Sequence, residues 1–237
     1  LCIQPLWLRS VENADAEMLD PALYPGAMSF VDDIEPPGDV QVKPDPILAR
    51  GIMTTVAENW CFIPEQEPAD YFKEVQRDGE TPCVFGDVNS DVEVYLVGGS
   101  HAEQYSSALD YLGREMGFKL VPLTRVGCPI ELGDDLTVTP ECAEWGKHVV
   151  DRIEEADPAL VVSNSTRPGR PYGHGPDAVP AGYKAFWDEL AANDIPFLGF
   201  RDNPWGFDDK GQGLQFDECY VATEDSLGCG MRFEEVY

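Results

Sequence analysis

From residue 92 onward, short apolar runs alternate with amphipathic segments. Apolar runs of strand length occupy residues 92–99, 118–124, 158–165 and 195–202. Segments whose apolar residues recur at helical spacing separate these runs, at residues 101–117, 139–157 and 181–193. Strands that alternate with helices are typical of a parallel sheet covered on both faces. The pattern therefore predicts a three-layer α/β/α sandwich with a central parallel sheet, of the flavodoxin-like kind.

The first third of the chain has a different composition. Residues 1–90 carry scattered prolines and acids, most clearly in the stretch 24–46, and such composition favours irregular structure. One helix is predicted there, over 45–60, because apolar side chains recur at roughly helical spacing up to Trp60. We expect an irregular leader over 1–90 that packs on an α/β domain over 91–237.

Ligands of open parallel sheets bind at the carboxyl ends of the strands. Three strand ends therefore deserve scrutiny, at Gly98–His101, Ser163–Thr166 and Arg201–Asn203. At the first of them a Gly-Gly turn delivers Ser100 to the start of a helix. A serine there is either an exposed nucleophile beside unpaired backbone N–H groups or simply a good helix N-cap, and the spacing alone leaves both interpretations open.

The charge of the chain excludes one class of partner. Against 16 Lys and Arg stand 44 Asp and Glu, a net charge of −28, and a surface this acidic repels nucleic acid and anionic lipid headgroups. No stretch approaches the length of apolar sequence that spans a membrane. The three histidines are dispersed and the acids show no ligand spacing, so we expect neither a metal nor an organic cofactor.

Seven cysteines without a C-x-x-C pair indicate disulfides in an oxidising compartment. Pairing them in sequence order closes three short loops, Cys61–Cys83, Cys128–Cys142 and Cys219–Cys229. Cys2 is then left over, so its partner is expected outside this chain, unless the thiol is free. The opening "LCIQPLWLRS" reads as the middle of a longer exported or membrane-anchored protein.

The segment "VYLVGGSHAEQYSSALDYL", residues 94–112, resembles the first block of the SGNH, or GDSL-like, hydrolase superfamily. In particular it is similar to the extracytoplasmic SGNH domain fused to membrane acyltransferases of the acyltransferase-3 family, where the block reads Gly-Asp-Ser-His-Ala. Further matching segments follow in the order of those domains, namely "YPGA", "PDPILA", "CVFGD", "GCP", "ECAEW" and "FRDNP".

The resemblance assigns roles to three residues. It implies that Ser100 is the nucleophile and that its own backbone N–H donates to the oxyanion. Gly127 is the nearest match to the glycine that supplies a second donor, and Asn164 to the asparagine that supplies a third. Two or three donors that converge on one oxygen are what a tetrahedral acyl-transfer intermediate needs.

The chain departs from the family at two points. Gly99 stands where the family has an aspartate, and no Asp-x-x-His motif, the family's source of the catalytic base, occurs in the sequence. His148 belongs to a predicted helix, whereas His174 lies in a loop and is a possible accessory residue. His101 is a second possible accessory, although neighbouring side chains diverge and it is a poor base for Ser100. Either the chain stops before the motif or it is a divergent, inactive copy.

The leading hypothesis is the extracytoplasmic half of a membrane O-acyltransferase, tethered to the membrane by an acyltransferase domain of the same polypeptide. It would transfer an acyl group, expected to be acetyl, through Ser100 to a hydroxyl of an envelope glycan or glycolipid. One alternative is an inactive SGNH-like module that holds a glycan with the loop aromatics Tyr172, Trp205 and Phe207. The other is a free secreted carbohydrate esterase.

Overall fold

The computed structural model describes residues 19–26, 29, 40, 41, 43, 51–168, 177–203 and 215–230. It divides into two compact units that are treated separately below. One comprises Leu1–Ile52 with Gln215–Gly230, and the other Met53–Leu214 with Met231–Tyr237. The second unit holds the sheet, and residues 53–90 belong to it.

The sheet has five strands in the order β1-β3-β2-β4-β7. Their bounds are Phe85–Gly86 for β1, Glu93–Gly98 for β2, Lys119–Thr124 for β3, Leu160–Asn164 for β4 and Phe197–Phe200 for β7. β1 pairs antiparallel with β3, and every other pairing is parallel. The central parallel sheet predicted from the sequence is therefore present. Its connectivity reverses direction between β2 and β4, which is where doubly wound sheets bind ligands.

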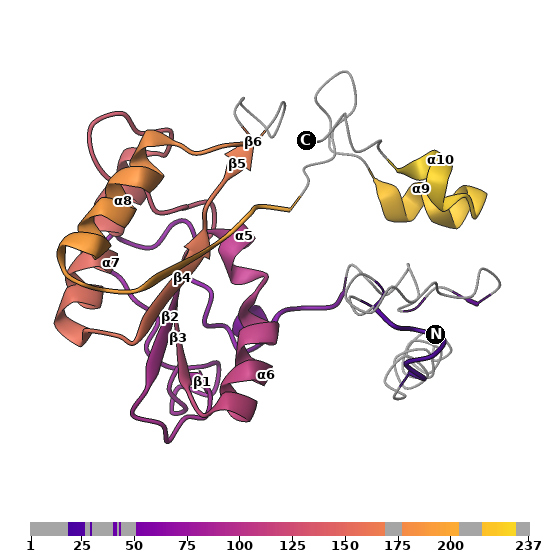
Figure 1. Cartoon of the computed structure of the whole chain (residues 1–237), viewed down its shortest axis with the longest axis horizontal. Coiled ribbons are helices and arrows are strands. Elements are labelled where there is room, and N and C mark those ends of the chain that lie inside the picture. The colour runs from indigo at the N-terminus through magenta and orange to yellow at the C-terminus, as the bar shows by residue number, and fades with distance from the viewer. Residues whose placement is uncertain are drawn as a thin grey trace. The chain divides into compact units, whose positions relative to one another are not determined.

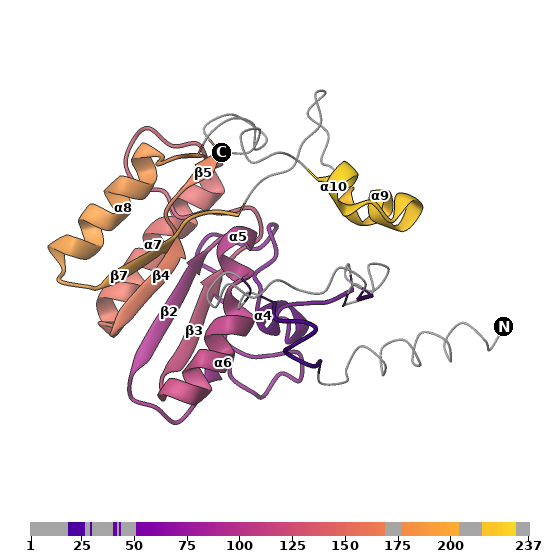
Figure 2. The same cartoon turned by 45° about the vertical axis from the view of Figure 1, so that its right-hand side comes forward.

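Helices cover both faces of this sheet (Figures 1 and 2). They are α4 (Thr55–Glu58), α5 (Ser100–Glu103), α6 (Ser106–Met116), α7 (Pro140–Ala156) and α8 (Ala181–Ala192). The alternation of side chains along β2 divides the core between the two faces. Val94 and Leu96 pack on the side of α5 and α6, whereas Tyr95 and Val97 pack on the side of α7 and α8. The predicted three-layer α/β/α architecture is confirmed.

Capping residues explain where the longest helix begins and ends. Thr139 has extended backbone angles and its side chain accepts a hydrogen bond from the Cys142 N–H, as an N-cap does, and Pro140 occupies the first turn. Asp157, in the left-handed conformation, ends the helix. α7 therefore follows the prediction for 139–157 closely.

Two helix predictions need correction. The segment 101–117 forms two helices, α5 and α6, because the chain turns at Gln104 and Tyr105, where the Tyr105 N–H bonds to the Ala102 carbonyl. The helix predicted over 45–60 is wrong for its described part. Only Thr55–Glu58 is helical, since Thr54 has the extended conformation of an N-cap, and residues 44–50 lie outside the described residues.

The structure contains the three disulfides predicted from the sequence. Cys61–Cys83 and Cys128–Cys142 lie in the unit that holds the sheet. Cys219–Cys229 joins α9 (Phe216–Thr223) to α10 (Ser226–Cys229) in the other unit. Cys2 lies outside the described residues.

Candidate active site

Ser100 occupies the first position of α5, directly beyond the central strand β2. β2 ends at Gly98 and Gly99 is the N-cap of the helix. Gly98 has a φ of +131°, and a Cβ there would lie 2.9 Å from the Cβ of Ala102, so both backbone conformation and space require glycine. The turn leaves Ser100 exposed, at the strand end where the sequence analysis places it.

A cavity of about 110 Å³ adjoins Ser100. It brings together the residues that the resemblance singles out, since Ser100, Gly127 and Asn164 all line it. The other lining residues are Gly99, His101, Pro129, Arg167, Tyr183 and Asp202. Asn164 reaches the cavity because it ends β4, the parallel neighbour of β2.

Unpaired hydrogen-bond donors gather at this cavity. Within the described residues, neither the backbone N–H of Ser100 nor that of Gly127 donates a hydrogen bond. The Ser100 N–H is free because the first N–H groups of a helix have no partner in the helix itself. Gly127 has a φ of +72°, a turn conformation in which the chain leaves the ladder of β3. Such donors suit an oxygen that becomes negatively charged during reaction.

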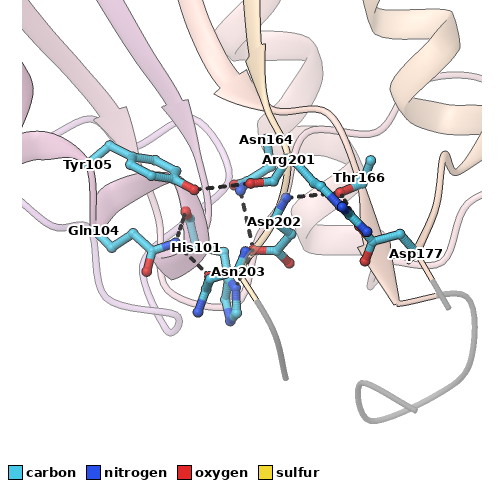
Figure 3. A network of polar contacts seen from close by, with 9 residues as sticks. All are labelled: His101, Gln104, Tyr105, Asn164, Thr166, Asp177, Arg201, Asp202 and Asn203. Carbon is cyan, nitrogen blue, oxygen red and sulfur yellow. Dashed lines mark hydrogen bonds and ion pairs between the residues drawn. The ribbon is translucent and has the colours of Figure 1, made fainter. Parts of the chain in front are cut away.

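Asp202, just beyond β7, orients two of the side chains that line the cavity (Figure 3). Its carboxylate is 2% exposed and accepts from His101 Nδ1 at 2.7 Å, from Asn164 Nδ2 at 3.4 Å and from the Asn203 N–H at 3.0 Å. Because a carboxylate only accepts, Asn164 must turn its amide nitrogen, and His101 a protonated Nδ1, toward Asp202. The second N–H of Asn164 remains for a ligand, and a neutral His101 ring carries its lone pair on Nε2.

Further hydrogen bonds fix Asp202 in place (Figure 3). Its N–H donates to Thr166 Oγ1 at 2.9 Å, and that hydroxyl donates to Asp177 Oδ2 at 3.3 Å. Arg201 Nε binds the same Asp177 oxygen at 2.5 Å. Asp202 is therefore anchored through the residues that follow β4 and through β6 (Asp177–Ala178).

The wall formed by Arg167 and Tyr183 was not foreseen from the sequence. Arg167 opens the short strand β5 (Arg167–Pro168) and Tyr183 lies in the first turn of α8. Burial raises the pKa of Tyr183 above its ordinary value, so its hydroxyl stays protonated. Asp202 lies within a strand end that the sequence did single out, but its contact with His101 could not be read from residues about a hundred positions apart.

Some candidates from the sequence do not reach this site. His148 belongs to α7, does not line the cavity and lies 3.8 Å from Asp151. The possible accessory His174 and the loop aromatics lie outside the described residues, these aromatics being Tyr172, Trp205 and Phe207. Among the histidines that the structure describes, only His101 lines the cavity.

Comparison with known proteins settles the family. Residues 61–229 match the family model described as the SGNH domain that is fused to AT3, or acyltransferase-3, domains. The chain belongs to this SGNH domain family. Neither the curated proteins nor the solved structures include a match to the chain. The family match begins at Cys61, within the stretch that composition alone marks as a leader.

The family and the disulfides together indicate that this SGNH domain is extracytoplasmic. Three disulfides in one chain are typical of an oxidising compartment. Among the helices that the structure describes, none is both long and apolar enough to span a bilayer. The described residues also include no group of three or more His, Cys, Asp or Glu that would hold a metal ion.

Gly99, the residue before Ser100, is tightly enclosed. A Cβ at this position would lie 3.3 Å from the backbone N of Pro129 and 3.4 Å from backbone atoms of Cys128. Cys128 is held by its disulfide to Cys142, and the ring of Pro129 stiffens the next residue. The 128–129 backbone therefore lies where a side chain at position 99 would need space.

We expect Gly99→Ala to lower the free energy of unfolding by about 1–3 kcal/mol, the usual cost of overpacking. Gly146→Ala is the matched control, because Gly146 lies inside α7 and its added Cβ would make an ordinary 3.6 Å contact with the Glu131 carbonyl. That change should raise stability by up to about 1 kcal/mol through helix propensity. Denaturant titration measures both. Equal effects of the two substitutions would contradict the close approach at Gly99.

Proposed function

We propose that this SGNH domain forms an acyl ester on Ser100 and passes the acyl group to a hydroxyl of an envelope glycan or glycolipid. It would do so as the extracytoplasmic half of a membrane O-acyltransferase of the same polypeptide. The family's fusion to acyltransferase-3 domains supports the membrane partner. The acceptor follows from the resemblance and from the extracytoplasmic location.

One observation carries the proposal. The exposed Ser100 lines one cavity together with Gly127 and Asn164, and within the described residues the N–H groups of Ser100 and Gly127 donate no hydrogen bond. The Ser100 hydroxyl makes no hydrogen bond within the described residues, so it is not acting as a helix cap. A cap would need to accept from a backbone N–H two or three residues on. The donors instead suit the oxyanion of a tetrahedral intermediate.

The chemistry proceeds in two halves. First the Ser100 oxygen attacks the carbonyl carbon of the acyl donor, the bond from that carbon to the donor's leaving group breaks, and the serine proton ends on the leaving group. Then the acceptor hydroxyl attacks acyl-Ser100, the ester bond to serine breaks, and the acceptor's proton returns to the Ser100 oxygen. Both tetrahedral intermediates place a negative oxygen among the same donors.

The small cavity supports a short acyl group. Its volume of about 110 Å³ is well below the roughly 300 Å³ at which pockets begin to hold drug-sized ligands. An acetyl group has two carbons, whereas a fatty acyl chain would extend far beyond the residues that line the cavity. Acetyl transfer is therefore the form of the reaction that we propose.

His101 is the accessory proton carrier in this proposal. Its ring is held by the 2.7 Å contact between Nδ1 and the buried Asp202 carboxylate, which fixes the orientation of the imidazole at the cavity. Since adjacent side chains on a helix diverge, we assign His101 to the attacking acceptor hydroxyl rather than to Ser100. The base for Ser100 itself is expected in an Asp-x-x-His motif, which these 237 residues do not contain.

A second candidate is an inactive glycan-holding module, and Gly99 favours it. Reaction of the full-length protein with a fluorophosphonate, followed by peptide mapping, separates the two. We expect one phosphonyl group on Ser100 in folded protein and none after denaturation, because only an activated serine reacts. Folded protein that stays unlabelled, or labelling spread over other serines, would favour the inactive module.

A further inference from the structure

We propose that Arg167 and Tyr183 form a subsite for an uncharged, oxygen-bearing group of the substrate, and that Glu131 sets this preference by neutralising Arg167. The subsite is part of the cavity beside Ser100. This inference rests on the proposed function, since it describes the group that lies next to acyl-Ser100. It adds a substrate class that the oxyanion donors do not specify.

Tyr183 provides the first observation. The residue is 5% exposed and lines the cavity, yet its hydroxyl makes no hydrogen bond within the part of the chain that the structure describes. Burial raises its pKa, so the group remains a donor at physiological pH. The hydroxyl is not among the fully buried polar atoms that lack a partner, so it is accessible although the rest of the residue is buried. Because the residue lines the cavity, a ligand oxygen there can accept a hydrogen bond from it.

Arg167 provides the second observation. Its side chain is 29% exposed, and Nη1 lies 3.4 Å from Glu131 Oε1 and 3.3 Å from Thr137 Oγ1. A guanidinium has five N–H donors in a rigid fork. Contacts through one nitrogen leave the remaining donors of this residue to the cavity that it lines. Arg167 and Tyr183 thus offer donors to the same ligand.

Glu131 is built into the fold as the counter-ion. Its side chain is fully buried, and its carboxylate accepts from the Thr137 N–H at 2.7 Å and from the Thr137 hydroxyl at 2.5 Å. Gly182 makes room for it, because a Cβ at that position would lie 2.6 Å from the Glu131 Cβ. The negative charge behind Arg167 is therefore fixed in position.

Charge decides what the subsite accepts. Arg167 and Glu131 together carry no net charge, so an anionic ligand would meet a guanidinium that is already paired and a carboxylate close behind it. The net charge of −28 on the chain opposes an anion as well. Hydroxyl and carbonyl oxygens accept hydrogen bonds from Arg167 and Tyr183 without that repulsion. A neutral sugar fits these requirements and a uronic acid does not.

Methyl β-glucoside and methyl β-glucuronide test this directly, because they differ in a hydroxymethyl group against a carboxylate. Binding is measured by ligand-observed NMR on full-length protein carrying Ser100→Ala, which separates the result from any reaction at the serine. We expect the glucoside to bind about tenfold more tightly. Tighter binding of the glucuronide, or binding of neither sugar, would overturn the inference. Neither result would bear on whether Ser100 becomes acylated.

Two further variants test whether Glu131 and Tyr183 cause the preference for the glucoside. Glu131→Gln leaves Arg167 as an uncompensated cation, so the preference should move toward the glucuronide by about tenfold or more. Tyr183→Phe removes only a hydroxyl and keeps the packing, so it remains informative if Glu131→Gln does not fold. It should weaken glucoside binding by roughly 3- to 10-fold. An unchanged affinity in Tyr183→Phe would contradict the subsite, as would an unchanged preference in folded Glu131→Gln.

Discussion

Acyl transfer should fall by on the order of 10⁴-fold or more when Ser100 is replaced by alanine in the full-length protein, the scale seen when serine nucleophiles are removed. The fold should hardly change, because Ser100 is exposed and its hydroxyl has no hydrogen bond within the described residues. Surface substitutions of that kind alter the free energy of unfolding by less than about 0.5 kcal/mol. Lost activity with retained stability is the signature of a nucleophile.

Ser107→Ala is the matched control for this experiment. Ser107 is also an exposed serine near the start of a helix, but its hydroxyl accepts a hydrogen bond from the Thr55 N–H and it does not line the cavity. Its removal should leave the transfer rate intact. A transfer rate in Ser100→Ala that matches the rate in Ser107→Ala would remove Ser100 from the mechanism.

Asn164→Ala should lower the rate of acyl transfer by about 100- to 1000-fold, the effect of losing one oxyanion donor. The loss should appear in kcat and leave KM nearly unchanged, because the donor acts on the charged intermediate and not on the bound substrate. Asn164 is 8% exposed, so thermal unfolding must be followed in parallel. Removing its amide also leaves Asp202 with one fewer partner.

Asn193→Ala is the matched control for Asn164→Ala. This asparagine caps the end of α8 and donates to Glu154 at 3.0 Å, outside the cavity. Its loss should cost some stability and no catalytic rate. If Asn164→Ala raised KM and left kcat intact, Asn164 would be a substrate-binding residue and the assignment to the oxyanion would fail.

The sequence predicted those parts of the fold in which a local pattern decides the outcome. β2 and α7 follow from an apolar run ended by glycine and from a Thr-Pro start. The split between α5 and α6 escaped prediction because the helical spacing of apolar residues continues through Gln104 and Tyr105, and the turn there depends on tertiary packing. The spacing of apolar residues alone does not reveal such a break in a helix.

In the candidate site, too, some residues could be placed from the sequence, whereas their contacts could not. Ser100 and Asn164 could be placed from the sequence because each lies at the carboxyl end of a strand, and parallel strands end at one edge of the sheet. The contact between Asp202 and His101 depends on how β7 aligns with β4. The pairing of Arg167 with Glu131 depends on how closely Gly182 lets α8 approach. These are tertiary distances, which no local spacing encodes.

Mapping the acyl group itself tests the central claim most directly. The full-length protein would be supplied with an acetyl donor alone, quenched in acid, digested and examined by mass spectrometry. The account predicts one acetyl ester on the peptide that contains Ser100, present with the donor alone and lost when an acceptor sugar is added. Transfer that runs at full rate while Ser100 carries no acetyl group at any time would contradict it.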